Sequence, residues 1–218
     1  MLTKIFKKVN TYNQNMTILN KTFYELGTLK VAHALIGKKL VRRIGGLELS
    51  GMIVETEAYC GEEDSACHAH RGQTKRNTVM FGPPGHAYVY FSYGMHYLLN
   101  MVTEAEGNPC AVLIRAILPV DGVEEMEARR KRKDSELTNG PAKLCQALGI
   151  DKTLNGWDLT AGNQLWVEDY KKIPAKRISA TPRIGIDYAK EKHRNALWRF
   201  VYKYEYYLEK SGRKHRAT

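Results

Sequence analysis

The sequence has no hydrophobic run long enough to cross a membrane. Its apolar runs, such as residues 110–114, stop far short of the roughly 20 residues that a membrane-spanning helix needs. The basic N-terminus leads into a polar stretch, residues 9–20, where a secretory signal would have an apolar segment. We therefore expect a protein that contacts no membrane and works inside the cell, in the cytoplasm or nucleoid of a bacterium or the nucleus of a eukaryote.

Cysteines are few and show no paired motif. The four of them, at positions 60, 67, 110 and 145, form no C-x-x-C motif and no ordered spacing with the seven histidines. This pattern argues against a disulfide framework and against a structural zinc site. We expect free thiols in a reducing compartment.

Acidic residues are the scarcer charge. The chain has 34 Lys and Arg against 23 Asp and Glu, a formal net charge of +11 and a pI of about 9.4. A strongly basic globular domain favours a polyanionic partner such as nucleic acid, although a basic surface without a ligand gives the same balance. The acids are unevenly placed, because five of them fall within residues 55–64. In a protein that binds phosphate groups, a cluster of carboxylates near the ligand indicates that these carboxylates have a functional role there.

Neither internal repeats nor a linker-like segment divides the chain, and 218 residues are enough to bury one core. We expect a basic, disordered N-terminus over residues 1–16, one folded domain over residues 17–207 and a basic tail over residues 208–218. The folded part is predicted to be α+β, a single domain with a curved, mostly antiparallel β-sheet flanked by helices.

Hydrophobic periodicity, caps and turn residues predict the individual elements. Strands are expected over residues 39–43, 47–59, 86–92, 97–103, 110–118, 165–168 and 197–204. The continuously apolar run 110–118 is typical of a buried central strand. Helices are expected over residues 21–36, 122–132 and 141–148, with Asn20 and Asp121 as N-caps, Pro141 in a first turn, and Gly37 and Gly149 as stops.

The strand over residues 47–59 carries the densest group of carboxylates. Strand periodicity places four of its residues on one face: Ile53, Glu55, Glu57 and Tyr59. The other face, which small and apolar side chains mark as the buried one, takes Val54, Thr56 and Ala58. A solvated edge of the sheet would show the same pattern, so the strand alone leaves both a functional site and a plain surface open.

Aromatic side chains are concentrated between residues 88 and 97: Tyr88, Tyr90, Phe91, Tyr93, His96 and Tyr97. Most belong in a packed sheet, where tyrosine is common. Tyr93 is different, because residues 93–96 are predicted to form the turn between two strands. An exposed ring in a basic protein can wedge into a base stack, and other rings can stack on a base that has left the duplex.

Separate motifs follow one another in a fixed order along the chain: Glu55-Thr56-Glu57-Ala58-Tyr59, Asp64 and His68, Thr74-Lys75-Arg76-Asn77, Tyr88-Val89-Tyr90, Tyr93-Gly94-Met95, Asn100, Leu113-Ile114-Arg115-Ala116, Asn139-Gly140-Pro141-Ala142-Lys143-Leu144 and Pro182-Arg183-Ile184-Gly185-Ile186. Together they resemble the alkyladenine (3-methyladenine) DNA glycosylase family. The resemblance runs from about residue 20 to residue 204. It implies a DNA repair enzyme that flips alkylated or deaminated purines out of duplex DNA and hydrolyses their N-glycosidic bond.

The resemblance implies roles for two residues in catalysis and one in opening the duplex. Glu57 matches the general base that activates a water, Arg115 matches the arginine that helps to hold this water, and Tyr93 matches the wedge that fills the gap in the duplex. Glu55 is expected to be structural, because loss of a cationic base needs only one carboxylate. No lysine stands in the place of Glu57, so base release without strand cleavage is expected.

Four further residues match the pocket that receives the base. Tyr59, His68 and Tyr90 match the residues that sandwich it, and Asn100 matches a residue that disfavours the exocyclic amine of normal guanine. Two residues sit in segments that, in the family, lie near the DNA backbone: Arg76 and Lys143. We expect double-stranded DNA containing damaged purines as the partner, no cofactor, no metal, and a monomer.

Two other classes of function fit part of the pattern. A metal-dependent hydrolase would use ligand types between residues 57 and 70, including His68 and His70, although their spacing is not that of a zinc site. The loop over residues 69–73 is also about one residue shorter than in the mammalian proteins, and no role is assigned to His70. A non-catalytic DNA damage-binding protein would need the charge and the aromatic rings but not Glu57.

Overall fold

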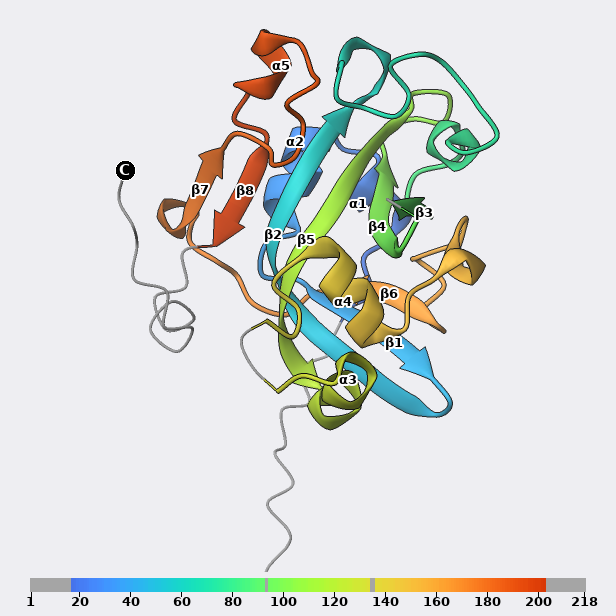
Figure 1. The fold of residues 1–218 in the computed structure, drawn as a ribbon, viewed down its shortest axis with the longest axis vertical. Helices are drawn as coiled ribbons and strands as arrows, with labels where there is room; N and C mark the ends of the chain where they lie inside the picture. Colours follow the sequence, from blue (N-terminus) through green and yellow to red (C-terminus); the bar gives the residue numbers. More distant parts are fainter. Residues whose placement is uncertain (1–16, 93, 134–135, 203–218) are drawn as a thin grey trace, which may run out of the picture.

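An antiparallel sheet of eight strands organises the part of the chain that the computed structural model describes, residues 17–92, 94–133 and 136–202 (Figure 1). The strands run in the order β3-β4-β5-β2-β1-β6, and β8 pairs with both β2 and β7 beside this path. Their bounds are β1 Lys39–Ile44, β2 Leu47–Cys60, β3 Ala87–Ser92, β4 His96–Thr103, β5 Cys110–Asp121, β6 Leu165–Glu168, β7 Ile178–Thr181 and β8 Arg199–Tyr202. The predicted α+β class with an antiparallel sheet is confirmed.

β2 and β5 form the centre of the sheet. Their pairing runs from Ser50 opposite Asp121 to Cys60 opposite Cys110. β5 lies between β4 and β2, as the apolar run 110–118 predicts. All seven predicted strands are present with small shifts at their ends, although residues 203–204 lie outside the described part. The short β7 was not predicted.

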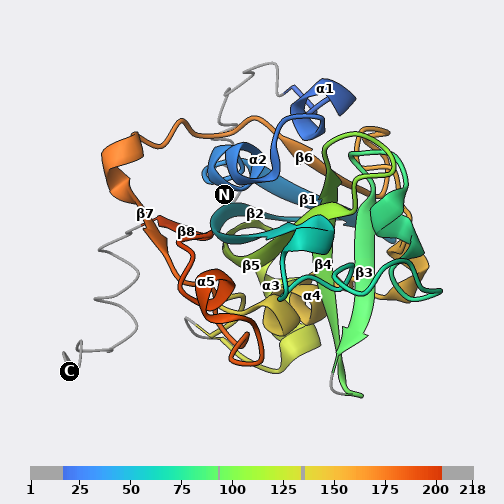
Figure 2. The same cartoon turned by 90° about the horizontal axis from the view of Figure 1, so that it is seen from above.

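Helices cover both sides of the central strands. Figures 1 and 2 place α2 (Thr28–Ala34) on one side of β2 and β5, and α3 (Val123–Arg130) and α4 (Pro141–Leu148) on the other. α2 packs on β2 and β5, whereas α4 packs on β4, β5 and α3. Their apolar side chains join those of the sheet in the main core, which includes Val31, Leu99, Ile114 and Leu144. The predicted flanking by helices is therefore confirmed.

The helix predicted over residues 21–36 is two helices, α1 (Lys21–Tyr24) and α2. The side chain of Asn20 caps α1, as predicted. A new helix then begins at Thr28, whose backbone N–H and hydroxyl both donate to the carboxylate of Glu104. This contact joins segments 76 residues apart, so a local period does not reveal the break.

Asp121 is not the cap of the following helix. It ends β5, where its carboxylate accepts a hydrogen bond from the hydroxyl of Ser50 at 2.5 Å. Gly122 takes the cap position of α3 with φ +70°, and a Cβ there would lie 2.4 Å from the side chain of Leu49. The neighbouring strand thus keeps Asp121 in the sheet, and a left-handed glycine makes the turn. Two other helix signals are confirmed for α4, Pro141 in its first turn and Gly149 as its left-handed C-cap.

A bulge in β2 alters the predicted alternation. The register with β5 shifts between Ile53 and Glu55 and again between Glu55 and Thr56. Ile53 packs in the main core. The bulge separates it from Glu55 and Glu57, with which it was predicted to share a face. The prediction that only the opposite face is buried is also wrong, because Glu57 is fully buried. Residues from the C-terminal part of the chain, including Ile184, cover the sheet at this point.

The predicted N-terminal segment, residues 1–16, and the basic tail, residues 208–218, lie outside the described residues, so the domain boundaries stay predictions. The four cysteines are free thiols, as predicted. Within the described ranges, no helix combines the length and the apolar character required to cross a bilayer.

Candidate active site

A pocket of about 370 Å³ opens between the sheet and a C-terminal segment, residues 184–188. Strands β2 to β5 contribute about half of its lining, the segment over residues 66–80 adds a further part, and α4 contributes Pro141. Apolar and aromatic side chains alternate with a small polar set, which consists of His68, Arg76, Ser92, Asn100 and Arg115. A concave, mostly apolar pocket with a few converging polar groups is typical of a site for a small molecule or a single base.

Glu57 lies directly behind this lining. Its exposed fraction is 0%, and three residues of the lining donate hydrogen bonds to its carboxylate. The hydroxyl of Tyr59 (2.9 Å) and Nη1 of Arg115 (3.2 Å) both bind Oε2. The backbone N–H of Ile184 binds Oε1 at 2.8 Å. Three donors from separate parts of the chain therefore hold one carboxylate at the pocket.

Burial raises the pKa of Glu57, because the charged form loses its hydration. The charge of Arg115, the N–H of Ile184 and the hydroxyl of Tyr59 favour the ionised form and limit the rise. Burial and the neighbouring Glu57 also raise the pKa of Tyr59, so its hydroxyl remains a proton donor. A carboxylate with a raised pKa holds a proton better than an exposed glutamate, and a general base near neutral pH requires this property.

Arg115 links Glu55 and Glu57 of β2. Its Nε donates to Oε1 of Glu55 at 2.9 Å, while its Nη1 reaches Glu57. The same oxygen of Glu55 accepts a hydrogen bond from Nε of Arg199 at 2.7 Å. Burial by itself would lower the pKa of Arg115, but the two glutamates outweigh it and raise this pKa. Glu55 therefore contacts the guanidinium and is not among the residues that line the pocket, and its structural role stays a prediction.

The three predicted stacking residues, Tyr59, His68 and Tyr90, all line the pocket. The rings of His68 and Tyr90 are 4.5 Å apart between centroids, at an angle of 74°. Tyr88, to which the sequence assigned no role, is hydrogen-bonded through its hydroxyl to Nδ1 of His68 at 2.9 Å. Burial, and then the charge of Arg76, lower the pKa of His68 to about 4. The imidazole is therefore neutral at pH 7.

Asn100 and Arg76 also belong to the lining. Asn100 is buried, and its Nδ2 donates to the backbone carbonyl of Tyr88 at 3.2 Å. Arg76 donates from Nη2 to the carbonyl of Phe91 at 3.1 Å, and its guanidinium carbon lies 5.2 Å from the ring centroid of Tyr90. Both residues are thus placed to contact a ligand in the pocket.

One predicted DNA contact, Lys143, is not among the residues that line the pocket. Lys143 donates from Nζ to Oδ1 of Asn139 at 2.9 Å and lies 3.6 Å from a carboxylate oxygen of Glu136. It sits on α4, whose first residue, Pro141, does line the pocket. Tyr93, the predicted wedge, lies outside the described residues.

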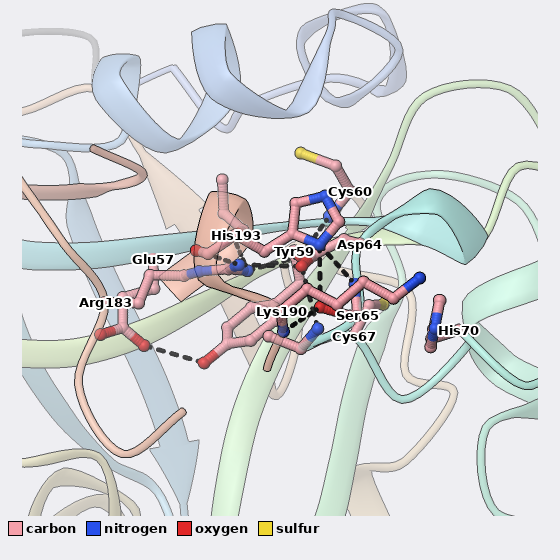
Figure 3. A network of polar contacts seen from close by, with 12 residues as sticks. Glu57, Tyr59, Cys60, Asp64, Ser65, Cys67, His70, Arg183, Lys190 and His193 are labelled. Carbon is pink, nitrogen blue, oxygen red and sulfur yellow. Dashed lines mark hydrogen bonds and ion pairs between the residues drawn. The ribbon is translucent and has the colours of Figure 1, made fainter. Parts of the chain in front are cut away.

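A polar network beside the pocket was not predicted (Figure 3). Arg183 forms a bidentate ion pair with Asp64 and immediately precedes Ile184, which binds Glu57. Both charged residues occur in the motifs of the sequence, but no role could be attached to them. The ion pair joins positions 119 residues apart, and neither strand alternation nor motif spacing indicates such a contact.

The histidines considered as metal ligands have other partners. His70 is hydrogen-bonded through Nδ1 to the carbonyl of Glu62 at 2.6 Å, and His68 is bonded to Tyr88. Across residues 17–92, 94–133 and 136–202, no group of three or more His, Cys, Asp or Glu side chains is placed to hold a metal ion.

Comparison with known proteins gives a consistent result. The model of the methylpurine-DNA glycosylase family matches residues 22–206. A protein of Methanocella arvoryzae, assigned by name to 3-methyladenine DNA glycosylase, is 52% identical over 189 residues, which cover 85% of this chain and 92% of the relative. A protein of Carboxydothermus hydrogenoformans with the same assignment is 50% identical over 194 residues, covering 88% of this chain and 99% of the relative. The chain therefore belongs to the methylpurine-DNA glycosylase family, whose members are hydrolases of N-glycosidic bonds.

Proposed function

We propose that the chain is a monofunctional DNA glycosylase that removes alkylated or deaminated purines, such as 3-methyladenine, 7-methylguanine and hypoxanthine, from duplex DNA. The observation that carries this proposal is the buried carboxylate of Glu57, held by three donors behind a pocket lined with aromatic rings. A protein that only binds damaged DNA gains nothing from a buried carboxylate beside a phosphate-rich ligand. Such a group is useful where a proton must be taken up.

In the proposed reaction, Glu57 activates a water. The two carboxylate oxygens together offer about four acceptor sites, and three protein donors use three of them, so capacity for one water remains. The water oxygen attacks the anomeric carbon of the sugar, its proton passes to Glu57, and the electrons of the N-glycosidic bond leave with the purine. The products are a free base and an abasic site. Arg115 orients the carboxylate and the water.

The pocket supports selectivity for damaged purines. Most glycoside hydrolases need an acid and a base, but an alkylated purine is already cationic and leaves with little protonation. A cationic base between Tyr59, His68 and Tyr90 gains about 0.5–2 kcal/mol from each favourable aromatic face. The neutral imidazole of His68 adds no repulsion to this stack. Normal purines lack the gain, and Asn100 disfavours the exocyclic amine of guanine.

Base flipping is part of the proposal. The glycosidic bond is out of reach in a stacked duplex, and extruding a nucleotide costs a few kcal/mol, less for a damaged or mispaired base. Tyr93 fills the vacated space and so offsets part of this cost. Basic residues, among them Arg76 and Lys143, contact the phosphates of the DNA backbone. The enzyme acts as a monomer on the DNA inside the cell.

The test is base release from labelled duplexes that each carry one lesion, with chelator present, by the wild type and Glu57→Gln. We expect the wild type to release the base and the variant to be slower by about 10²–10⁴-fold, because general base catalysis contributes that much. Lesion binding should persist in the variant, and circular dichroism checks its fold, since a glutamine amide would face three donors. Binding without release by the wild type would instead indicate a damage-binding protein.

A further inference from the structure

The ion pair between Arg183 and Asp64 is entirely buried, with both side chains at 0% exposure. Nη1 of Arg183 donates to Oδ2 of Asp64 at 2.5 Å, and Nη2 donates to Oδ1 at 2.8 Å. Replacing a buried ion pair of this kind by well-packed apolar residues is often neutral or stabilising. Stability alone therefore does not account for the pair, and its place beside the pocket is informative.

The guanidinium of Arg183 fixes a ring of the pocket from behind. Its carbon lies 4.7 Å from the ring centroid of Tyr59 and 4.9 Å from that of Trp198. Nη1 also donates to the carbonyl of Ala58 at 2.8 Å, and Nη2 reaches the carbonyl of His193 at 3.3 Å. One side chain thus joins β2, just before Tyr59, to the backbone at His193.

Asp64 connects the segment over residues 60–66 to the same guanidinium. Its carboxylate accepts hydrogen bonds from the backbone N–H of Cys60 at 3.2 Å and of Ala66 at 3.0 Å. Burial by itself would raise the pKa of Asp64, but the hydrogen bonds and charge of Arg183 outweigh it, so this pKa is lowered. Asp64 is therefore ionised at neutral pH.

Further hydrogen bonds join the segment over residues 60–66 to the segment after residue 183 (Figure 3). Ser65 donates its backbone N–H to Nδ1 of His193 at 3.0 Å, and its hydroxyl accepts from the N–H of Lys190 at 2.9 Å. The hydroxyl of Tyr188 donates to the carbonyl of Ala66 at 3.0 Å. The segment that ends at residue 66 and the segment after residue 183 are therefore joined by several hydrogen bonds.

We propose that Arg183 and Asp64 are positioning residues for base excision, and this inference rests on the proposed function. The pair places the segment after Arg183 so that the N–H of Ile184 points at Oε1 of Glu57, and it holds the ring of Tyr59 at the face of the flipped base. In this way one buried ion pair sets both the protonation of the Glu57 carboxylate and the orientation of the Tyr59 ring that the flipped base contacts.

The test measures single-turnover base release against pH for Arg183→Lys and Asp64→Asn. Lysine keeps the charge of Arg183 but lacks the planar fork, so the segment that carries Ile184 is no longer held in place. Loss of that N–H raises the pKa of Glu57, because a hydrogen bond to the charged form favours it. Glu57 accepts a proton only above its pKa. The acidic limb of the rate profile should therefore move up by about one pH unit in both variants.

A second buried ion pair provides the matched control. Lys39 and Glu168, on β1 and β6, lie 2.7 Å apart with side chains 7% and 8% exposed. Glu168→Gln should lower the melting temperature much as Asp64→Asn does, yet leave the acidic limb of the wild type in place. A limb that stays in place in both site variants, or that shifts equally in Glu168→Gln, would overturn the inference. Absence of release by the wild type would instead overturn the proposed function on which it rests.

Discussion

Replacing Arg115 by glutamine should move the pH range in which the enzyme works. Nη1 of Arg115 lies 3.2 Å from Oε2 of Glu57, whose side chain is fully buried. Burial raises the pKa of Glu57, and the charge of Arg115 is the largest effect opposing this rise. An opposite charge at such a distance lowers a carboxyl pKa by about 1–3 units. Without it the pKa of Glu57 rises further, and we expect the acidic limb of base release to move up by about two pH units.

The sign of this shift follows from the role of a base. Below its pKa Glu57 is protonated and cannot accept a proton from water, so the variant should lose most rate at low pH and recover part of it as the pH rises. The plateau should stay below that of the wild type, because in the proposed reaction Arg115 also orients the water. Single-turnover release at saturating enzyme, from about pH 5 to pH 9, measures both effects.

Arg199→Gln is the control for this experiment. Arg199 shares the Oε1 atom of Glu55 with Arg115 and pairs with Glu57 in the β2–β8 ladder, but within the described residues no hydrogen bond or ion pair joins its side chain to the Glu57 carboxylate. It should therefore change the acidic limb far less. The reasoning would be refuted by an acidic limb that stays in place in Arg115→Gln, or by one that shifts as far in Arg199→Gln.

Two further predictions concern the pocket. Asn100→Ser should increase release of normal guanine by about 10-fold, because steric or polar exclusion in a pocket is worth about 1–3 kcal/mol, while release of hypoxanthine changes little; competition between the two substrates checks this, and equal changes for both would contradict it. His68 should titrate near pH 4 in a proton NMR experiment, because burial and the charge of Arg76 disfavour its protonated form, and Arg76→Gln should raise this value. A midpoint near the ordinary value of 6.5 in the wild type would show that the ring is not held in the pocket as described.

Most of the sheet could be predicted, because its strands are long enough to show their period. The apolar run 110–118 indicated the central strand, and the pattern of β2 placed Glu55, Glu57 and Tyr59 side by side. The bulge at Glu55 and the break before Thr28 could not be predicted, since partners far away in the sequence decide both. A period is a local property, whereas these two features are tertiary.

The same division applies to the site. The motifs contain lining residues such as Tyr59, His68 and Tyr90, and the resemblance to the family implied their roles. Burial of Glu57 was not predicted, because the residue that completes its hydrogen bonds, Ile184, comes from another segment. The pair of Arg183 and Asp64 was not predicted for the same reason, although both residues belong to the sequence motifs. Local spacing shows which side chains share a strand, not which backbone will cover them.

The separation of 127 residues between Glu57 and Ile184 also has a consequence for biosynthesis. At 5–20 residues per second, the ribosome needs roughly 6–25 s to make the chain between them. During that interval the central strands can pair, but β8 has not joined β2 and the carboxylate lacks its last donor. The nascent protein can thus acquire most of its fold before its reactive centre is assembled. The hydrogen bonds of the Glu57 carboxylate are then complete only after residue 184 has been synthesised.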